Sequence, residues 1–194
     1  MDWCNDNVCM WTYRNYKKMK KFTLFLPLIV LIFIAFFLFI FLLQNKDPSK
    51  PPSALLNENL PKFIMVDLFN NKENISNKDL KEKTIIINFF ASWCIPCKTE
   101  HPIFFNIKKE FPDVYLVGIN HKDELKDALT FLKEDGNPYD KVGIDNKGSV
   151  GLEFGVFGLP ETFLVDVTGK IIYKHLGPLT NKIFQDEIKP FLTK

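Results

Sequence analysis

The chain has 194 residues, with 25 Lys and Arg against 23 Asp and Glu, which gives a formal net charge of +2. Charged residues make up 25% and hydrophobic residues 46%, ordinary values for a globular protein. This composition excludes a disordered tail protein, a collagen-like fibre and a nucleic-acid binder that depends on bulk positive charge, and four cysteines are too few for a small secreted domain held together by disulfides.

A long apolar segment near the N-terminus predicts one transmembrane helix. Residues 22–43 read FTLFLPLIVLIFIAFFLFIFLL and contain no charged residue. As a helix, a segment of this length extends about 33 Å, enough to cross a hydrocarbon core of about 30 Å. A helix buried in a protein core seldom reaches this length without a polar position.

Basic residues before this segment predict its orientation. Five Lys or Arg residues lie between positions 14 and 21, whereas the stretch that follows the segment is mostly polar and uncharged. Because positive charge stays on the cytoplasmic side, residues 1–21 are predicted to be cytoplasmic and the rest of the chain exported. The segment is longer than the usual signal-peptide core of about 7–15 residues, and no A-x-A cleavage site follows it. We therefore predict an uncleaved signal anchor, with a cleaved signal peptide as the alternative.

Residues 1–18 precede a second possible start of the protein. Met19, followed by Lys20 and Lys21, would by itself open a compact anchor, so residues 1–18 could reflect a start site placed too early. Cys4 and Cys9 lie in this prefix, with no His or further Cys nearby to complete a metal site. We assign no role to these two cysteines.

A linker and a single domain follow the anchor. Residues 44–61 contain four prolines and mostly polar side chains, so they are predicted to be extended. Residues 62–194 have the size of one ordinary domain.

Strands and helices alternate along this domain. Strands are predicted over residues 62–69, 83–90, 114–120, 141–145, 162–166 and 170–175. Helices are predicted over residues 96–110, 123–134, 148–154 and 181–192. The strand at 83–90 is apolar and rich in Ile, as a strand buried on both faces should be. This order predicts an α/β domain with a mixed sheet covered by helices on both faces.

A Cys-x-x-Cys motif follows the buried strand directly and opens a helix. It reads Trp93-Cys94-Ile95-Pro96-Cys97. A helix N-terminus has free N–H groups and about half a positive charge, and both favour a thiolate. Pro96 fits the first helical turn, where no N–H is needed. Cys94 is therefore predicted at the exposed tip, where it can attack the disulfide of a partner, and Cys97 one turn inside, where it resolves the mixed disulfide.

Three other roles for this pair are disfavoured. A zinc site needs four ligands, but only three His accompany the pair in the exported part, and no second pair has metal spacing. Haem attachment needs Cys-x-x-Cys-His, whereas Lys98 follows Cys97. A purely structural disulfide that closes so short a loop would stabilise the fold little. Redox chemistry is the favoured role.

The motif and its surroundings resemble the thioredoxin superfamily. Residues 90–97 (FASWCIPC) are similar to its active-site strand and turn. Leu159-Pro160, followed by a strand, is similar to its cis-proline loop, which faces the redox pair, and we predict that this bond is cis. A cis bond would present the Leu159 main chain to a substrate strand. Asn88 stands where cytosolic thioredoxins usually have a buried Asp, which argues against a general cytosolic reductant.

The resemblance narrows to the DsbE (CcmG) family of thiol:disulfide interchange proteins, which act in cytochrome c maturation. Residues 155–166 (GVFGLPETFLVD) resemble the signature of that family. Further similar motifs lie at residues 99–101, 136–139 and 187–190. The order of basic tip, single anchor, linker and domain also resembles the family, and the likeness extends over residues 19–194. It implies a thioredoxin-like α/β domain preceded by one transmembrane helix.

The resemblance also implies roles for five residues. Cys94 is then the nucleophile, Cys97 the resolving thiol and Pro160 the cis-proline, while Glu100 and Glu161 are acidic residues around the pair. Negative charge near the pair would raise the thiol pKa, and a partly buried Glu could take the proton released from a thiol. The alternative for each Glu is a solvated surface charge.

Two further residues lie near the pair in the sequence, and neither is assigned a catalytic role. Trp93 would either shield the thiolate or pack in the core. His101 is expected on the helix surface rather than as a catalytic base.

The function implied is a dithiol reductase anchored in the bacterial inner membrane, with its domain in the periplasm. It would reduce a disulfide of apocytochrome c, or of a thiol chaperone that holds it, and a membrane electron donor of the DsbD/CcdA type would recharge it. We expect no cofactor beyond the Cys94–Cys97 disulfide, no metal, no nucleic-acid partner and a monomer. The alternatives are a general periplasmic disulfide oxidant and a non-catalytic module that binds apocytochrome.

The orientation can be measured in intact cells. The basic residues before residue 22 place Cys94 outside the cytoplasm, so a membrane-impermeant thiol reagent should label the reduced Cys94. Labelling that appears only after lysis would reverse the orientation.

Overall fold

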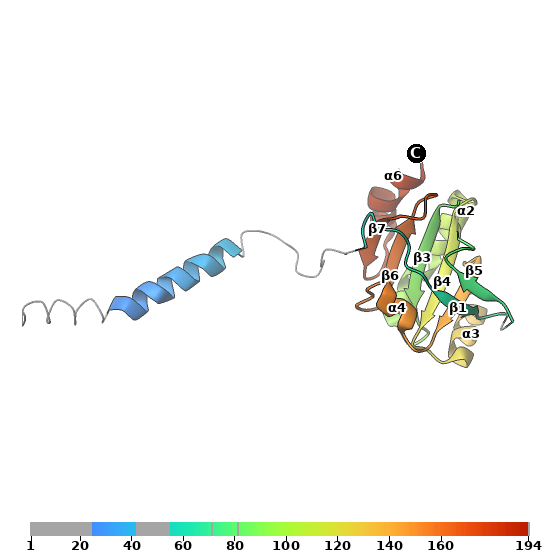
Figure 1. Ribbon diagram of the computed structural model, residues 1–194, viewed down its shortest axis with the longest axis horizontal. Helices are drawn as coiled ribbons and strands as arrows, with labels where there is room; N and C mark the ends of the chain where they lie inside the picture. The colour runs from blue at the N-terminus through green and yellow to red at the C-terminus, as the bar shows by residue number, and fades with distance from the viewer. Residues whose placement is uncertain (1–24, 42–54, 71, 81, 194) are drawn as a thin grey trace, which may run out of the picture. The chain divides into compact units, whose positions relative to one another are not determined.

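The computed structural model describes residues 25–41, 55–70, 72–80 and 82–193 (Figure 1). The chain divides into two compact units, residues 1–50 and residues 51–194, and each is described by itself.

The described part of the first unit is one helix over residues 25–41. Its large apolar side chains are exposed. Among the described residues, no helix is both long enough and apolar enough to cross a membrane. The structure therefore does not confirm the predicted transmembrane helix. The ends of the predicted anchor, the predicted cytoplasmic segment and the first part of the predicted linker lie outside the described residues.

Seven strands of the second unit form one mixed sheet in the order β2-β1-β5-β4-β3-β6-β7. The strands are β1 (Ile64–Asp67), β2 (Asn74–Ser76), β3 (Ile85–Phe90), β4 (Tyr115–His121), β5 (Lys141–Asp145), β6 (Glu161–Val165) and β7 (Ile171–Leu176). Strands β3, β4 and β5 run parallel, and every other neighbouring pair is antiparallel. The predicted thioredoxin-like α/β sheet is confirmed.

Helices cover both faces of this sheet (Figure 1). They are α2 (Ile95–Glu110), α3 (Leu125–Glu134), α4 (Ser149–Glu153) and a C-terminal helix made of α5 (Asn181–Ile183), the π-helical η1 (Phe184–Ile188) and α6 (Lys189–Leu192). One core cluster joins α2, α3 and the C-terminal helix to one face, and α4 contributes to the cluster on the other. In Figure 1, α4 lies in front of the sheet and α2 behind it.

Strand β3 is the centre of the domain. All six of its residues are buried, and it lies between β4 and β6. Its side chains alternate, so Ile86 and Phe90 enter the core beneath α2, while Ile87 and Phe89 enter the core beneath α4. Because both faces are covered, the end of β3 has one fixed position, and α2 starts a few residues beyond it.

The predicted strands and helices are all present, with ends shifted by a few residues, but β2 was not predicted. The sequence around β2 is polar, and Ile75 is its only buried residue. The strand exists because its main chain pairs with β1, with Met65 opposite Ile75. Such pairing leaves no apolar pattern in a segment this short.

The predicted linker extends too far toward the domain. Residues 55–60 belong to the domain, because Asn57 N donates to Ile171 O at 2.8 Å and Leu60 N donates to Gly169 O at 2.8 Å. Leu55 and Leu60 also pack against the core. The linker was predicted from its prolines and polar residues. The two leucines were the sign in the sequence that the domain begins earlier.

Candidate active site

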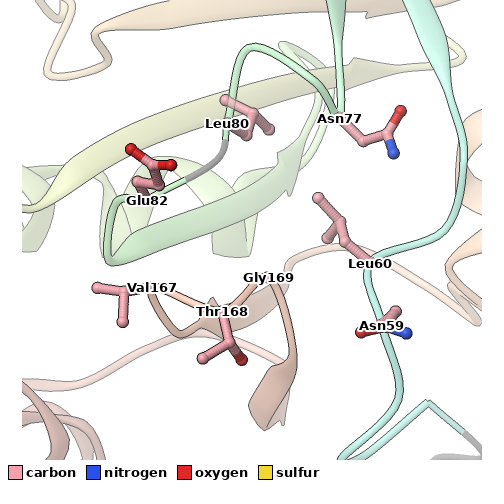
Figure 2. A pocket seen from close by; sticks show the side chains of 8 residues that line it. All are labelled: Asn59, Leu60, Asn77, Leu80, Glu82, Val167, Thr168 and Gly169. Carbon is pink, nitrogen blue, oxygen red and sulfur yellow. The ribbon is translucent and has the colours of Figure 1, made fainter.

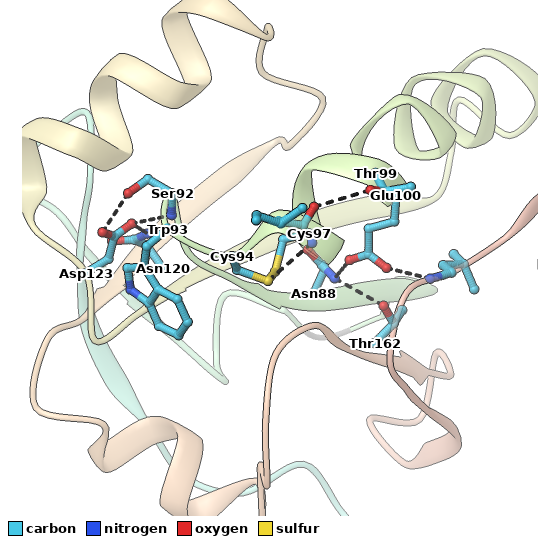
Figure 3. Close-up of a disulfide and its surroundings, with 12 residues drawn as sticks. Asn88, Ser92, Trp93, Cys94, Cys97, Thr99, Glu100, Asn120, Asp123 and Thr162 are labelled. Atoms are coloured by element: carbon cyan, nitrogen blue, oxygen red, sulfur yellow. Dashed lines mark hydrogen bonds between the residues drawn. A yellow bond between two sulfur atoms is a disulfide. The ribbon is translucent and has the colours of Figure 1, made fainter.

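Cys94 and Cys97 form a disulfide where β3 leads into α2 (Figure 3). Their Cα atoms are 5.3 Å apart. Cys94 is the N-cap of α2, and its Sγ accepts a hydrogen bond from Cys97 N at 3.2 Å. Pro96 occupies the first turn, where no N–H is required. In the reduced protein, the same N–H group and the helix dipole would stabilise a Cys94 thiolate.

The disulfide is more covered than predicted. Cys94 is only 4% exposed, so its predicted place at an exposed tip is wrong for the oxidised protein. The exposed atoms beside the pair belong to Trp93 and Ile95, which are 60% and 77% exposed. Leu159, from the far end of the chain, packs against the cluster that contains both cysteines. The resemblance to the thioredoxin superfamily had predicted that this loop faces the pair, although the Cys-x-x-Cys motif alone does not show it.

The end of β4 holds the turn that carries Trp93. The buried Asp123 accepts hydrogen bonds from Ser92 N at 2.6 Å and from Ser92 Oγ at 2.8 Å. Trp93 Nε1 donates to Lys122 O at 3.1 Å. Figure 3 shows Asp123 facing Ser92 beside the exposed Trp93 ring. Trp93 therefore does not pack in the core, and Asp123 is a supporting residue that the sequence did not reveal.

The Leu159–Pro160 peptide bond is cis, as predicted. Strand β6 runs antiparallel to β3, with Glu161 opposite Phe89. The chain that precedes β6 therefore passes the carboxyl end of β3, where the turn to Cys94 begins. Pro160 O accepts a hydrogen bond from Gly177 N at 2.9 Å, which ties this loop to the end of β7.

Glu100 is buried, and the alternative of a solvated surface charge is wrong for it. Its side chain is 1% exposed and lies one helical turn after Cys97. Oε1 accepts a hydrogen bond from Asn88 Nδ2 at 2.7 Å, and Oε2 accepts one from Leu179 N at 2.7 Å. Burial raises the pKa of Glu100 from 4.5 to about 7, although the hydrogen bonds from Leu179 and Asn88 act in the opposite direction.

Asn88 connects Glu100 to two hydroxyl groups. Its Oδ1 accepts a hydrogen bond from the Tyr139 hydroxyl at 2.8 Å, and its Nδ2 also donates to Thr162 Oγ1 at 3.1 Å. Burial and the charge of Glu100 raise the pKa of Tyr139 well above its usual value, so Tyr139 remains a neutral donor. The network joins β3, β6, α2 and the segment before β5. In the sequence, the polar Asn88 within an apolar strand was the only sign of this network.

Glu161 is also buried, but it is paired with a positive charge. Its Oε2 lies 2.9 Å from Lys174 Nζ. Its Oε1 accepts hydrogen bonds from Phe157 N at 2.7 Å and Gly158 N at 3.3 Å. The alternative of a solvated charge is wrong here too. The two glutamates differ, because neutral donors surround Glu100 whereas Lys174 neutralises Glu161.

His101 is buried, so its predicted place on the helix surface is wrong. Its Nε2 lies 2.9 Å from Gly136 O, and its ring contacts the rings of Phe105, Phe131 and Tyr139. Burial lowers its pKa, which keeps the ring neutral at physiological pH. Among the described residues, no group of three or more His, Cys, Asp or Glu side chains could hold a metal ion.

A pocket at the other end of the sheet has none of these features (Figure 2). It lies at the turn between β6 and β7, beside the start of β3, and has a volume of about 310 Å³. It is lined by Asn59, Leu60, Asn77, Leu80, Glu82, Val167, Thr168 and Gly169. It contains no thiol and no imidazole, so the redox pair remains the candidate site.

Comparison with known proteins decides the family. The redoxin family profile matches residues 55–188. The chain is 37% identical over 180 residues to the thiol:disulfide interchange protein DsbE of Escherichia coli K12, which covers 91% of this chain and 96% of that protein. The chain belongs to the DsbE family. As a DsbE-family protein it is a thiol:disulfide oxidoreductase of the thioredoxin superfamily.

Further relatives are also named as thiol:disulfide interchange proteins. The chain is 38% identical over 174 residues to a probable DsbE-2 of Pasteurella multocida, with 90% of each chain covered. It is 37% identical over 153 residues to the interchange protein HelX of Rhodobacter capsulatus, which covers 78% of this chain and 85% of that protein. A crystal structure of a putative DsbE from Chlorobium tepidum has the same fold, with a TM-score of 0.62 at 24% identity, over 71% of this chain and 97% of that chain.

Replacing Glu100 with Gln should remove one pH dependence of stability. The folded protein keeps the Glu100 proton up to a pKa of about 7, whereas the unfolded chain loses it near 4.5. Between these pH values the folded state binds more protons, so the free energy of unfolding falls as the pH rises, by about 3 kcal/mol in total. Urea denaturation of the oxidised protein from pH 4 to pH 8 measures this fall.

The Gln variant should keep the fold. Asn88 can turn its amide over, because the hydroxyls of Tyr139 and Thr162 can each donate or accept. Glu134→Gln, which removes an equal charge from the exposed end of α3, is the control and should keep the full pH dependence. An equal pH dependence in Glu100→Gln and the wild type would show that the Glu100 carboxyl is not its source.

Proposed function

We propose that this protein reduces a disulfide of apocytochrome c, or of a thiol chaperone that holds it, before haem attachment. Haem attachment needs two free thiols, but an oxidising compartment pairs them. A dedicated dithiol reductant must therefore work there. The observation that carries the proposal is the Cys94–Cys97 pair at the start of α2, backed by a buried carboxylate, in a member of the DsbE family.

The reaction has two exchange steps. The Cys94 thiolate of the reduced protein attacks one sulfur of the substrate disulfide and expels the other as a thiolate, which takes up a proton. Cys97 then loses its proton, and its thiolate attacks Cys94 Sγ, which releases the second substrate sulfur as a thiolate that is protonated in turn. Two electrons pass to the substrate, and the product is the Cys94–Cys97 disulfide seen in the structure.

Glu100 is the proposed acceptor for the Cys97 proton. It lies one helical turn from Cys97, and a pKa of about 7 allows it to take up and release a proton at neutral pH. The buried hydrogen bonds from Asn88 and Leu179 fix its position. In this role, Glu100 acts during the second step, when the mixed disulfide is resolved.

Electrostatics favour a reductant over an oxidant. A strong oxidant stabilises its thiolate, which makes the reduced state favourable. Here the charge of Glu100 opposes a nearby thiolate and offsets part of the helix dipole. The charge of Glu161 is largely cancelled by Lys174, so Glu100 carries most of this effect. A less stabilised thiolate makes the protein more ready to give up its electrons.

We also propose that residues 22–43 anchor the chain in the bacterial inner membrane, with the domain in the periplasm. Support comes from the uncharged apolar segment and the basic residues before it. The likeness to DsbE of Escherichia coli covers 91% of the chain and so reaches well beyond residues 55–188. A membrane donor of the DsbD/CcdA type would return the electrons, and the protein would act as a monomer with no cofactor beyond its disulfide.

Cysteine variants test the proposed reaction. In a strain that cannot mature c-type cytochromes because it lacks this activity, the wild type should restore haem attachment and Cys94→Ser should not. Cys97→Ser should accumulate a mixed disulfide between Cys94 and apocytochrome c or its chaperone, because the resolving thiol is missing. Haem staining and non-reducing gels measure these outcomes.

Cys9→Ser is the matched control, since it removes a thiol to which no role is assigned. It should behave as the wild type. Restoration of haem attachment by Cys94→Ser would contradict the proposal and would favour a module that binds apocytochrome without catalysis.

A further inference from the structure

The loop beside the redox pair is supported by a lysine from the neighbouring strand. Lys174 lies in β7, opposite Phe163 of β6, and its side chain is 5% exposed. An ammonium group so covered is costly unless it is paired and hydrogen-bonded. Its Nζ lies 2.9 Å from Glu161 Oε2 and donates to Gly155 O at 2.8 Å.

The same lysine is placed against two aromatic rings. Its Nζ lies 5.0 Å from the centre of the Phe163 ring and 5.3 Å from the centre of the Phe157 ring. Both distances suit an attraction between a cation and the face of an aromatic ring. Phe157 is 77% exposed, so Lys174 steadies one side of a ring whose other side faces solvent.

Lys174 and Glu161 together hold the main chain at three points. Lys174 binds Gly155 O, while Glu161 accepts hydrogen bonds from Phe157 N and Gly158 N. These points lie in residues 155–160, which join α4 to β6 and form neither helix nor strand. Main-chain hydrogen bonds hold the two ends of this loop, at residues 155–156 and at Pro160, so the side-chain contacts fix its middle.

This loop carries the groups that a bound polypeptide would meet. It ends in the cis Leu159–Pro160 bond, and Leu159 packs against the cluster that contains Cys94 and Cys97. An extended peptide can pair its main chain with such a segment, as in strand addition. A small disulfide without amide groups cannot pair in this way and needs only access to Cys94.

We propose that Lys174 is a positioning residue for polypeptide disulfides. By neutralising Glu161 and holding Gly155 O, it fixes the main chain of residues 155–160 on which the substrate chain lies. Without Lys174, the Glu161 carboxylate is buried beside N–H donors alone, and it must move toward water or take up a proton. Either change loosens the bonds to Phe157 and Gly158. This inference rests on the proposed reduction of protein disulfides.

Two disulfide substrates distinguish a loss of substrate positioning from a general loss of activity. The reduced full-length protein, in detergent, is mixed with a peptide that contains a Cys-x-x-Cys-His disulfide, or with bis(2-hydroxyethyl) disulfide, which has no amide groups. Lys174→Met should lower the second-order rate constant for the peptide by about ten- to a hundredfold, the usual effect of a misplaced binding segment. The rate constant for the small disulfide should fall much less, because that substrate does not pair with the main chain of the loop.

Three further variants sharpen the comparison. Lys174→Arg keeps the charge and the donors, so it should recover most of the peptide rate. Lys170→Met removes an exposed lysine from the same hairpin and should match the wild type on both disulfides. The double variant Lys174→Met with Glu161→Gln removes both charges of the buried pair, so it should fold even where the single variant does not, and it should retain a peptide-specific loss.

A peptide rate equal to that of the wild type in Lys174→Met, or an equal loss on both disulfides in the double variant, would overturn the inference. If the wild type does not reduce the Cys-x-x-Cys-His peptide, direct reduction of apocytochrome c fails instead, and the thiol chaperone remains as the proposed substrate. The same comparison with an unrelated disulfide-bonded polypeptide, such as insulin, then still decides the role of Lys174.

Discussion

The domain depends on the burial of β3 together with its one polar side chain, Asn88. The strand is covered on both faces, so an unsatisfied amide at this position would cost about 1–3 kcal/mol. Asn88 satisfies its amide by binding Glu100, Tyr139 and Thr162. These contacts tie α2 to the sheet one turn beyond Cys97. The position of the redox pair and the burial of Glu100 therefore arise from the same set of hydrogen bonds.

Two buried carboxylates lie around the pair, and their different partners give them different roles. Glu100 has only neutral partners, and burial raises its pKa to about 7. It can therefore exchange a proton near neutral pH. Glu161 pairs one oxygen with Lys174, and its other oxygen organises the loop that precedes β6. We therefore propose that proton transfer belongs to Glu100, and substrate positioning to Glu161 and Lys174.

The sequence predicted what local patterns encode. The apolar run of β3 and the motif at Cys94 were anticipated from a few adjacent residues, whereas the cis bond before Pro160 was anticipated from the resemblance to the thioredoxin superfamily. Burial of Glu100 was not, because Asn88 lies 12 residues and Leu179 lies 79 residues away from it. The pairing of Lys174 with Glu161 likewise depends on the register of β6 against β7. Strand β2 was missed because Ile75 is its only buried residue, so no alternating apolar pattern marks the strand.

The equilibrium between the Cys94–Cys97 pair and glutathione tests the central claim most directly, because the reduction potential of the pair sets the direction of electron flow. A reductant that works in an oxidising compartment should have a potential below about −200 mV, near those of reducing thioredoxin-like proteins. A potential near about −120 mV, typical of a strong disulfide oxidant, would contradict the account.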